Sequence, residues 1–298
     1  MNPVVEVRHL TKTYGKIDAV KDVSFKLEEG KIYGLLGRNG AGKTTIMHML
    51  TAQLFATSGE LKVFGQAPYE NEEVLRRLCF IKESQRYPDI FRIVDVLESA
   101  ASFFPNWDRA YAYALVEDFR LPLDRWMKKL SRGMLSAVGV IIGLASRAPL
   151  TFFDEPYLGL DAVTRALFYD RLREDYTEHP RTIVLSTHLI DEVSPLLEHV
   201  LVIRDGRLIV DEDADNLRGR AVTVMGPAAG VEAFATGKEV MDRQAFGGML
   251  TMTVMAPGGE AVRRQAKELG LELSPVSLQQ LIVRLTESPT PAKAVKTL

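Results

Sequence analysis

The sequence has almost no cysteine, no excess of either charge and no long hydrophobic run. Its 298 residues include one cysteine, Cys79, which excludes an internal disulfide and is typical of a cytoplasmic protein. The formal net charge of -2 at pH 7 gives no general basic surface, so no nucleic-acid partner is expected. The longest uncharged apolar run, Ala137 to Ser146, is much shorter than the roughly 20 residues that a membrane-spanning helix needs.

The N-terminus also lacks the apolar segment of a secretory signal, because Glu6 and Arg8 interrupt it. We therefore expect a chain that reaches a membrane only through a partner. The composition, with 46% hydrophobic and 26% charged residues, is ordinary for a globular protein. The length is enough for one large domain or two modest ones.

Two kinds of strand pattern occur along the chain. From Val4 to Tyr14, and again over residues 18–30, apolar and polar residues alternate, which predicts an antiparallel β edge. By contrast, Lys31 to Leu36 is a short apolar run that leads into a glycine-rich turn, and a helical pattern follows from Ile46 to Leu54. Three later apolar runs predict strands buried in a parallel sheet: Leu150–Phe153, Thr182–Leu185 and Val200–Ile203.

These patterns predict an α/β domain over residues 1–216 and a small α+β domain over 217–286. Residues 92–146 have helical spacing, and Asn106 is placed to cap one of the helices, so this stretch is expected to form a helical insertion in the first domain. The last segment, 287–298, is rich in Pro, Thr and Lys and is expected to be disordered.

A phosphate-binding loop is predicted directly after the strand at residues 31–36. The loop matches G-x-x-x-x-G-K-[ST] and, with the next threonine, consists of Gly37, Arg38, Asn39, Gly40, Ala41, Gly42, Lys43, Thr44 and Thr45. Glycines let the backbone N–H groups point at phosphate, and the following helix N-terminus adds favourable partial charge. Lys43 is expected to reach the β- and γ-phosphates, and the Thr44 hydroxyl is expected to bind Mg²⁺.

An acidic pair, Asp154 and Glu155, ends the apolar run that starts at Leu150. A parallel strand that ends in a carboxylate delivers it to the carboxyl edge of the sheet, beside the phosphate-binding loop. Asp154 is expected to hold Mg²⁺ through water. Glu155 is expected to orient or deprotonate the water that attacks the γ-phosphate.

Together with further motifs, these segments make residues 4 to about 210 resemble the ATPase subunits of ATP-binding cassette (ABC) transporters. The further motifs are Leu130-Ser131-Arg132-Gly133-Met134, similar to the signature L-S-G-G-Q, Gly159-Leu160-Asp161, similar to the D-loop, and Ser186-Thr187-His188, similar to the switch-histidine segment. The resemblance implies a P-loop NTPase of the ABC type, with a mixed sheet, an antiparallel β edge and a helical subdomain. It also implies hydrolysis of ATP with Mg²⁺.

The resemblance implies roles for the residues of these motifs. Tyr14 would stack on adenine, although it could also be an ordinary strand-end aromatic. His188 would act in catalysis with Glu155 and Lys43; alone it would more often be structural, but it follows a strand at the catalytic edge. Ser131, Arg132 and Gly133 would complete the ATP site of a second chain in a head-to-tail dimer, and Asp161 would lie in the D-loop.

Several positions depart from the family pattern. Arg132 stands where the signature has its first glycine, and Met134 stands where it has glutamine. The glutamine loop is also unusual, because the expected position holds Glu83 and the nearby glutamine is Gln85. We expect Gln85 to take the ATP- and metal-binding role, with Glu83 as the alternative.

The resemblance also implies separate transmembrane permease subunits and a position on the inner face of the cell membrane. The segment Ser277–Leu281 resembles the C-terminal extension of single-cassette exporter ATPases, which favours export. One alternative is a soluble ABC-type ATPase that acts on nucleic acid or ribosomes, but long coiled coils and a second cassette are missing. Another is a non-hydrolysing regulator, which the presence of Glu155 argues against.

Overall fold

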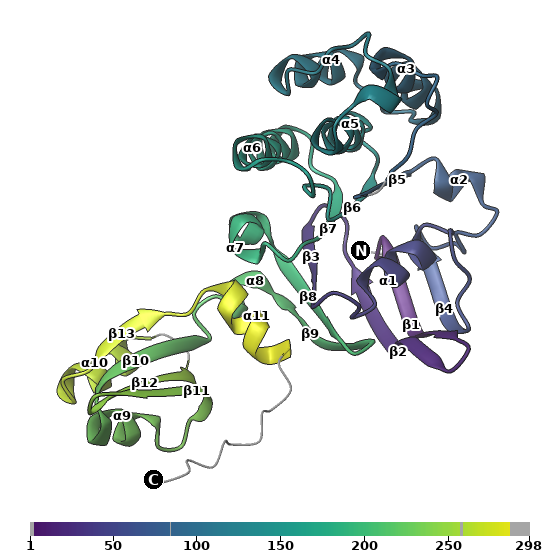
Figure 1. The fold of residues 1–298 in the computed structure, drawn as a ribbon. Helices are drawn as coiled ribbons and strands as arrows, with labels where there is room; N and C mark the ends of the chain where they lie inside the picture. The colour runs from purple at the N-terminus through teal and green to yellow at the C-terminus, as the bar shows by residue number, and fades with distance from the viewer. Residues whose placement is uncertain (1–2, 84, 257–258, 287–298) are drawn as a thin grey trace. The chain divides into compact units, whose positions relative to one another are not determined.

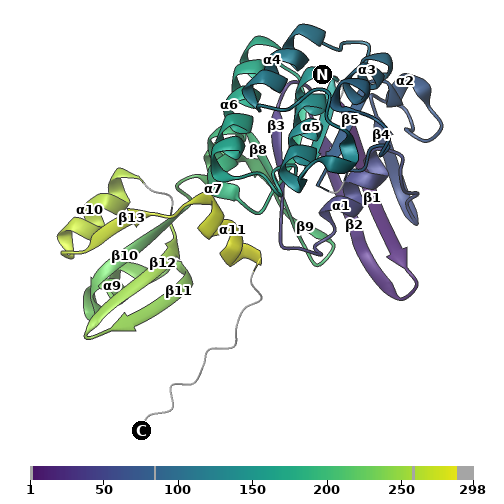
Figure 2. The same cartoon turned by 45° about the horizontal axis from the view of Figure 1, so that its top comes forward.

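The computed structural model describes residues 3–83, 85–256 and 259–286, drawn in Figures 1 and 2. The chain divides into two compact units. The first runs up to His188 and also contains Leu196–Asp211, whereas the second contains Leu189–Pro195 and the chain from Glu212 onward. The sequence patterns did not indicate that residues 189–195 join the second unit. The expected disordered tail, 287–298, lies outside the described residues.

The antiparallel β edge is present as a three-stranded sheet in the first unit, with the strand order β2-β1-β4. Its strands are β1 (Val5–Tyr14), β2 (Ile17–Leu27) and β4 (Ser58–Val63). Strand β1 pairs antiparallel with both neighbours, which confirms the prediction from the alternating pattern. The sequence analysis missed β4, because SGELKV is mostly polar and carries no clear alternation.

A six-stranded sheet, with the order β5-β6-β7-β3-β8-β9, positions the chemistry of the first unit. Its strands are β3 (Ile32–Leu36), β5 (Leu78–Lys82), β6 (Leu150–Asp154), β7 (Thr182–Ser186), β8 (His199–Arg204) and β9 (Arg207–Asp213). The first five of these strands pair in parallel, and β3, β6 and β7 are buried along their whole length. The three apolar runs are therefore parallel strands, as predicted, and their carboxyl ends meet at one edge.

Helix α1 (Lys43–Leu50) connects the two sheets of the first unit through a shared core. Its Ile46 and Met47 are fully buried in that core. The helix ends at Leu50 and not at Leu54, because Ala52 has a positive φ of 57°, which a continuing right-handed helix cannot accommodate. Helices α2 (Glu72–Leu75) and α6 (Ala162–Glu178) complete this part of the unit.

The helical insertion lies between β5 and β6 in the chain and gathers into one group in both views. Its elements are α3 (Ile93–Phe103), α4 (Arg109–Asp118), the 3₁₀ turn η1 (Met127–Lys129) and α5 (Arg132–Ala145). The prediction that Asn106 caps a helix of this insertion was wrong. Asp108 accepts the capping hydrogen bond from the Tyr111 N–H at 2.9 Å, whereas the Asn106 side chain donates to the Arg147 carbonyl at 3.2 Å.

The second unit contains a β-α-β-β-α-β sequence of elements around a four-stranded antiparallel sheet. These elements are β10 (Ala221–Pro227), α9 (Ala228–Ala235), β11 (Glu239–Phe246), β12 (Met249–Met255), α10 (Glu260–Glu268) and β13 (Glu272–Pro275). The strand order β11-β12-β10-β13 makes it a split βαβ sandwich of the ferredoxin-like type. The remaining helices are α7 (Ile190–Val193), η2 (Ser194–Leu196), α8 (Ala214–Leu217) and α11 (Leu278–Thr286).

Candidate functional site

The glycine-rich loop connects the end of β3 to the start of α1, as the motif requires. Gly37 adopts a φ of 144°, and a Cβ at this position would lie 2.2 Å from the carbonyl oxygen of Ile203. Only glycine therefore fits where the loop passes β8. The Gly206 N–H, outside the loop, donates a hydrogen bond to the Ala41 carbonyl at 3.0 Å. Within the loop, the Ala41 N–H donates to the Arg38 carbonyl at 3.1 Å.

The start of α1 presents backbone donors to an anion. Its N-cap is Gly42, which has no side chain to cap the helix, and the Ile46 N–H makes the bond to the Gly42 carbonyl at 3.0 Å. That bond is the first one within the helix. The N–H groups of Lys43, Thr44 and Thr45 come before it in the chain, so no carbonyl of the helix accepts from them. A helix N-terminus in this state favours a phosphate group.

The Lys43 side chain folds back over the loop and is only 5% exposed. Its Nζ donates to the carbonyl of Gly37 at 2.8 Å and to that of Arg38 at 3.2 Å. Burial lowers the pKa of Lys43, and the nearby carboxylates of Glu155 and Asp154 oppose that shift. A buried cation in such a place is suited to an anionic ligand, which adds negative charge beside the ammonium group.

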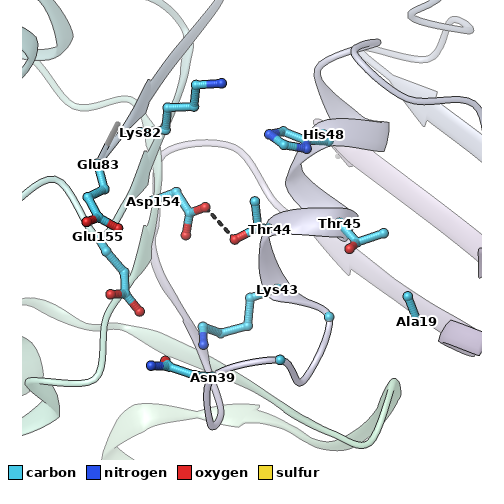
Figure 3. Close-up of a pocket in the computed structure, with 12 residues that line it drawn as sticks. Ala19, Asn39, Lys43, Thr44, Thr45, His48, Lys82, Glu83, Asp154 and Glu155 are labelled. Carbon is cyan, nitrogen blue, oxygen red and sulfur yellow. Dashed lines mark hydrogen bonds between the residues drawn. The ribbon is translucent and has the colours of Figure 1, made fainter. Parts of the chain in front are cut away.

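Thr44 and Asp154 meet across the site. The Thr44 hydroxyl donates to Asp154 Oδ2 at 2.6 Å, which joins the first turn of α1 to the end of β6 (Figure 3). Asp154 is 7% exposed. A hydroxyl and a carboxylate oxygen side by side are the hard oxygen donors that Mg²⁺ prefers, so these two residues fit the metal that the motif implies.

A cleft of about 410 Å³ lies along this edge, within the size range of small-ligand sites. Its lining consists of Ala19, Asn39, Gly40, Gly42, Lys43, Thr44, Thr45, His48, Lys82, Glu83, Asp154 and Glu155 (Figure 3). The cleft thus brings together the loop and the acidic pair, as the sequence analysis expected. Gly37, Arg38 and Ala41 shape the loop without lining the cleft. The sequence analysis did not identify Ala19, His48 and Lys82 as lining residues.

Glu155 has a backbone conformation that is unusual for a residue with a side chain, with a φ of 49°. Its N–H donates to the Ser186 carbonyl at 3.0 Å, which fixes the turn after β6 to the end of β7. Its Oε2 lies 3.3 Å from Nδ1 of His188, so the two expected catalytic side chains are neighbours. Strain of this kind is common where a fold holds a functional group in a fixed direction.

Tyr157 is a neighbour of His188 that the sequence analysis did not select. Its hydroxyl lies 3.0 Å from His188 Nδ1 and accepts a bond from the His188 backbone N–H at 3.1 Å. The signal was present in the sequence as a large aromatic residue directly after Asp154-Glu155-Pro156. Sequence spacing alone could not show that its hydroxyl contacts a residue in the segment after β7.

The expectation for Gln85 is not met by the structure. Glu83 lines the cleft, and its N–H donates to the Asp154 carbonyl at 3.1 Å. Gln85 instead lines a separate, mainly apolar cavity of about 280 Å³, and its Oε1 makes no hydrogen bond with any residue that the structure describes. The backbone bond to β6 holds Glu83 at the sheet edge, whereas the chain has turned away two residues later. Glu83, the alternative, is therefore the residue at the cleft.

The signature segment lies at the start of α5 and does not line the cleft of its own chain. Ser131 is the N-cap and accepts a bond from the Met134 N–H at 3.2 Å. Arg132 forms an ion pair with Glu83. At Gly133 an added Cβ would lie 2.5 Å from the Gly159 carbonyl oxygen, so glycine is needed for this close approach.

The two remaining candidates lie outside the cleft lining as well. Asp161 is the N-cap of α6 and accepts a bond from the Thr164 N–H at 2.8 Å, and this bond lowers the pKa of Asp161. Tyr14 ends β1 with its side chain 49% exposed, and Lys12 Nζ lies 5.2 Å from the centre of its ring. An exposed ring of this kind has a face open to a planar base.

Comparison with known proteins identifies the family. A family model described as ABC transporter matches residues 20–158. The bacitracin transport ATP-binding protein BcrA of Bacillus licheniformis is 30% identical over 74% of this chain and 73% of its own length. The chain belongs to the ABC transporter ATP-binding family. It is accordingly an ATPase.

Other members of the ABC family match the chain at similar levels. The ABC transporter ATP-binding protein YtrB of Bacillus subtilis is 26% identical over 95% of this chain and 96% of its own length, so this match includes the second unit. The Nod factor export ATP-binding protein I of Cupriavidus metallidurans is 30% identical over 71% of each chain. A solved ATP-binding subunit of an ABC transporter, at 24% identity, shares the fold with a TM-score of 0.65 over 72% of this chain and 91% of its own.

No helix among the described residues has both the length and the apolarity to cross a membrane.

Proposed function

We propose that this chain is the ATP-hydrolysing subunit of an ABC exporter and that separate transmembrane subunits carry the substrate. The observation that carries the proposal is the 2.6 Å bond from Thr44 to Asp154. It places the anion-binding start of α1 against the acidic end of β6, with Lys43 and Glu155 beside it. This is the arrangement that binding and hydrolysis of a nucleoside triphosphate require.

Binding of ATP is proposed to involve the loop, the start of α1, the acidic end of β6 and Tyr14. The N–H groups at the start of α1 hold phosphate oxygens, and Lys43 exchanges its two backbone carbonyl partners for β- and γ-phosphate oxygens. Thr44 and Asp154 would hold Mg²⁺, which would neutralise charge on the phosphates. Glu83 lines the same cleft and would contribute through water. The exposed ring of Tyr14 is proposed to stack on adenine.

Hydrolysis is proposed to depend on Glu155. Its carboxylate lines the cleft and accepts a proton from, or orients, the water that attacks the γ-phosphate. His188 touches that carboxylate through Nδ1 at 3.3 Å, so it can hold Glu155 and the γ-phosphate in one geometry. Lys43 stabilises the charge that develops on the phosphoryl oxygens.

A head-to-tail dimer with a second cassette is proposed to complete the site. Ser131, Arg132 and Gly133 lie at the start of α5, outside the cleft of their own chain, as residues that serve a partner's nucleotide must. Asp161, at the start of α6, lies close behind Gly159, against which Gly133 packs. The two segments therefore belong to one surface that is proposed to meet the partner chain.

The transmembrane subunits are proposed to dock at the apolar cavity between the segment after β5 and helix α3. Phe103, at the end of α3, lines this cavity and is 70% exposed, and Ile90 in the preceding segment is 74% exposed. Apolar side chains left in water near a cavity are typical of an interaction surface. The chain would thus lie on the inner face of the cell membrane. The relative named for Nod factor export supports export as the direction.

The test is the variant Glu155→Gln. Glutamine keeps the shape of the side chain but lacks the charge that activates water, so the turnover number should fall by about 100-fold or more while ATP binding persists. Phosphate release measures the first quantity, and calorimetry with ATP and Mg²⁺ measures the second. Turnover at the wild-type rate in this variant would remove Glu155 from the mechanism. The exposed Glu174→Gln on α6 is the matched control and should behave as wild type.

A further inference from the structure

Tyr157 is buried, with 2% of its surface exposed, yet its hydroxyl points at one functional side chain. The hydroxyl lies 3.0 Å from His188 Nδ1 and 3.1 Å from the His188 backbone nitrogen. The two rings also meet in an edge arrangement, with their centres 5.5 Å apart and an angle of 64° between their planes. Tyr157 therefore contacts both the main chain and the imidazole of the same residue.

The chemistry of a phenol suits this double contact. A tyrosine hydroxyl has one proton to donate and two lone pairs to accept with. One lone pair accepts the His188 N–H, and the same hydroxyl lies within hydrogen-bond distance of Nδ1. The hydroxyl can donate to Nδ1 of a neutral imidazole or accept from Nδ1 of an imidazolium. It can thus hold the ring in either protonation state, which a phenylalanine cannot do.

The geometry links this contact to the cleft. Glu155 Oε2 approaches the same Nδ1 atom at 3.3 Å, so Tyr157 and Glu155 both contact one side of the imidazole. Neither contact uses Nε2, and the ring is therefore oriented with Nε2 away from both. Glu155 and Tyr157 also share one turn, because the Leu158 N–H donates to the Glu155 carbonyl at 3.2 Å. This short turn fixes Glu155 and Tyr157 relative to each other.

We propose that Tyr157 is a positioning residue for ATP hydrolysis, which orients the His188 imidazole between Glu155 and the nucleotide. This inference rests on the proposed function of Glu155 and His188. It gives a reason for a large buried aromatic directly after Asp154-Glu155-Pro156. Tyr157 itself does not line the cleft and acts through His188.

The variant Tyr157→Phe tests this role, because it keeps the buried ring and removes only the hydroxyl. We expect kcat to fall about tenfold, which is the effect of losing one hydrogen bond worth about 1.4 kcal/mol in the transition state. The KM for ATP should change by less than about twofold, since the loop and Lys43 are untouched. The matched control is Tyr111→Phe, which removes the hydroxyl that donates to the Arg171 carbonyl at 3.3 Å, away from the cleft. It should leave both constants unchanged.

A spectroscopic measurement separates positioning from a general loss of stability. The chain has five histidines, so ring ¹⁵N resonances of a protein labelled only in histidine can be assigned, with His188→Gln identifying one of them. Tyr157→Phe should move the His188 resonances and leave the other four in place. Full kcat in Tyr157→Phe, or a lower kcat with unmoved His188 resonances, would overturn the proposal. A wild-type chain that hydrolyses no ATP would instead overturn the proposed function on which it rests.

Discussion

Lys43 illustrates how single residues of the cleft are organised for a ligand. Its ammonium group is almost fully buried and is held by backbone carbonyls, which carry only partial negative charge. Burial lowers its pKa, and Glu155 and Asp154 only partly oppose this. A triphosphate would supply full negative charge at the same place, so binding of an anion further offsets the free energy of desolvating Lys43.

Replacing this residue should therefore weaken binding directly. In a Glu155→Gln background, where ATP is not consumed, we expect Lys43→Ala to reduce ATP affinity on the order of 10- to 100-fold, the range for a hydrogen bond to a charged group. Calorimetry with Mg²⁺ measures the change, and the exposed Lys128→Ala is the control. Equal affinities with and without Lys43 would count against the phosphate-binding loop.

The same residue predicts a pH dependence. Because its pKa is lowered in the free protein, Lys43 loses its proton at a lower pH than an exposed lysine does. Affinity of the Lys43 protein for ATP should thus decline as the pH rises through that lowered pKa, and this decline should be absent in Lys43→Ala.

At the scale of elements, helix α5 connects two parts of the candidate site. Arg132 in its first turn pairs with Glu83 at the cleft, and Gly133 packs on Gly159 before the start of α6. Both Arg132 and Glu83 depart from the family pattern, and the structure places them in contact. The ion pair thereby connects the start of α5 to the cleft of its own chain. Ser131, at the same helix start, is exposed and can contact a second chain.

This arrangement predicts a crosslink between chains. Cysteines at Ser131 and Asn39, combined with Glu155→Gln, should form a disulfide between two chains only when ATP is bound, because a head-to-tail dimer brings α5 of one chain to the loop of the other. The native Cys79 can remain, since burial raises its pKa to about 12 and leaves the thiol unreactive. Ser131→Cys alone and Asn39→Cys alone are the controls and should stay monomeric on a non-reducing gel. A crosslink without ATP would contradict the sandwich arrangement.

At the scale of the whole molecule, the described chain combines a nucleotide-binding unit with a ferredoxin-like unit, and apolar surface remains exposed on the first. Phe103 lines a cavity in which no charged side chain takes part among the described residues, and it is exposed, as is Ile90 in the segment before α3. A docking partner that covers them would bury apolar area and so gain free energy.

The corresponding prediction concerns membrane association. In cells that hold the partner subunits, Phe103→Asp should shift most of the chain from the membrane fraction to the supernatant, because the partner would have to bury a carboxylate. The purified variant should keep wild-type ATPase activity, since Phe103 does not line the nucleotide cleft. Phe246→Asp, at an 88% exposed position in the second unit, is the control and should stay with the membrane. Unchanged fractionation of Phe103→Asp would contradict docking at this cavity.

The sequence by itself determined the parts whose signals are local. Continuous apolar runs predicted β3, β6, β7 and β8, because strands buried on both faces need apolar residues throughout. The loop from Gly37 to Thr44 and the pair Asp154-Glu155 were readable because their chemistry needs fixed residue types at fixed spacing.

Only the tertiary structure decided contacts between segments far apart in the chain. Spacing left Glu83 and Gln85 as alternatives, and the choice came from a backbone bond between Glu83 and β6 that no local pattern encodes. Tyr157 meets His188 for the same reason, since the segments that carry them follow β6 and β7, and the pairing of these two strands brings the segments together. Sequence patterns specify which groups a strand delivers to the sheet edge, whereas packing specifies which of those groups touch.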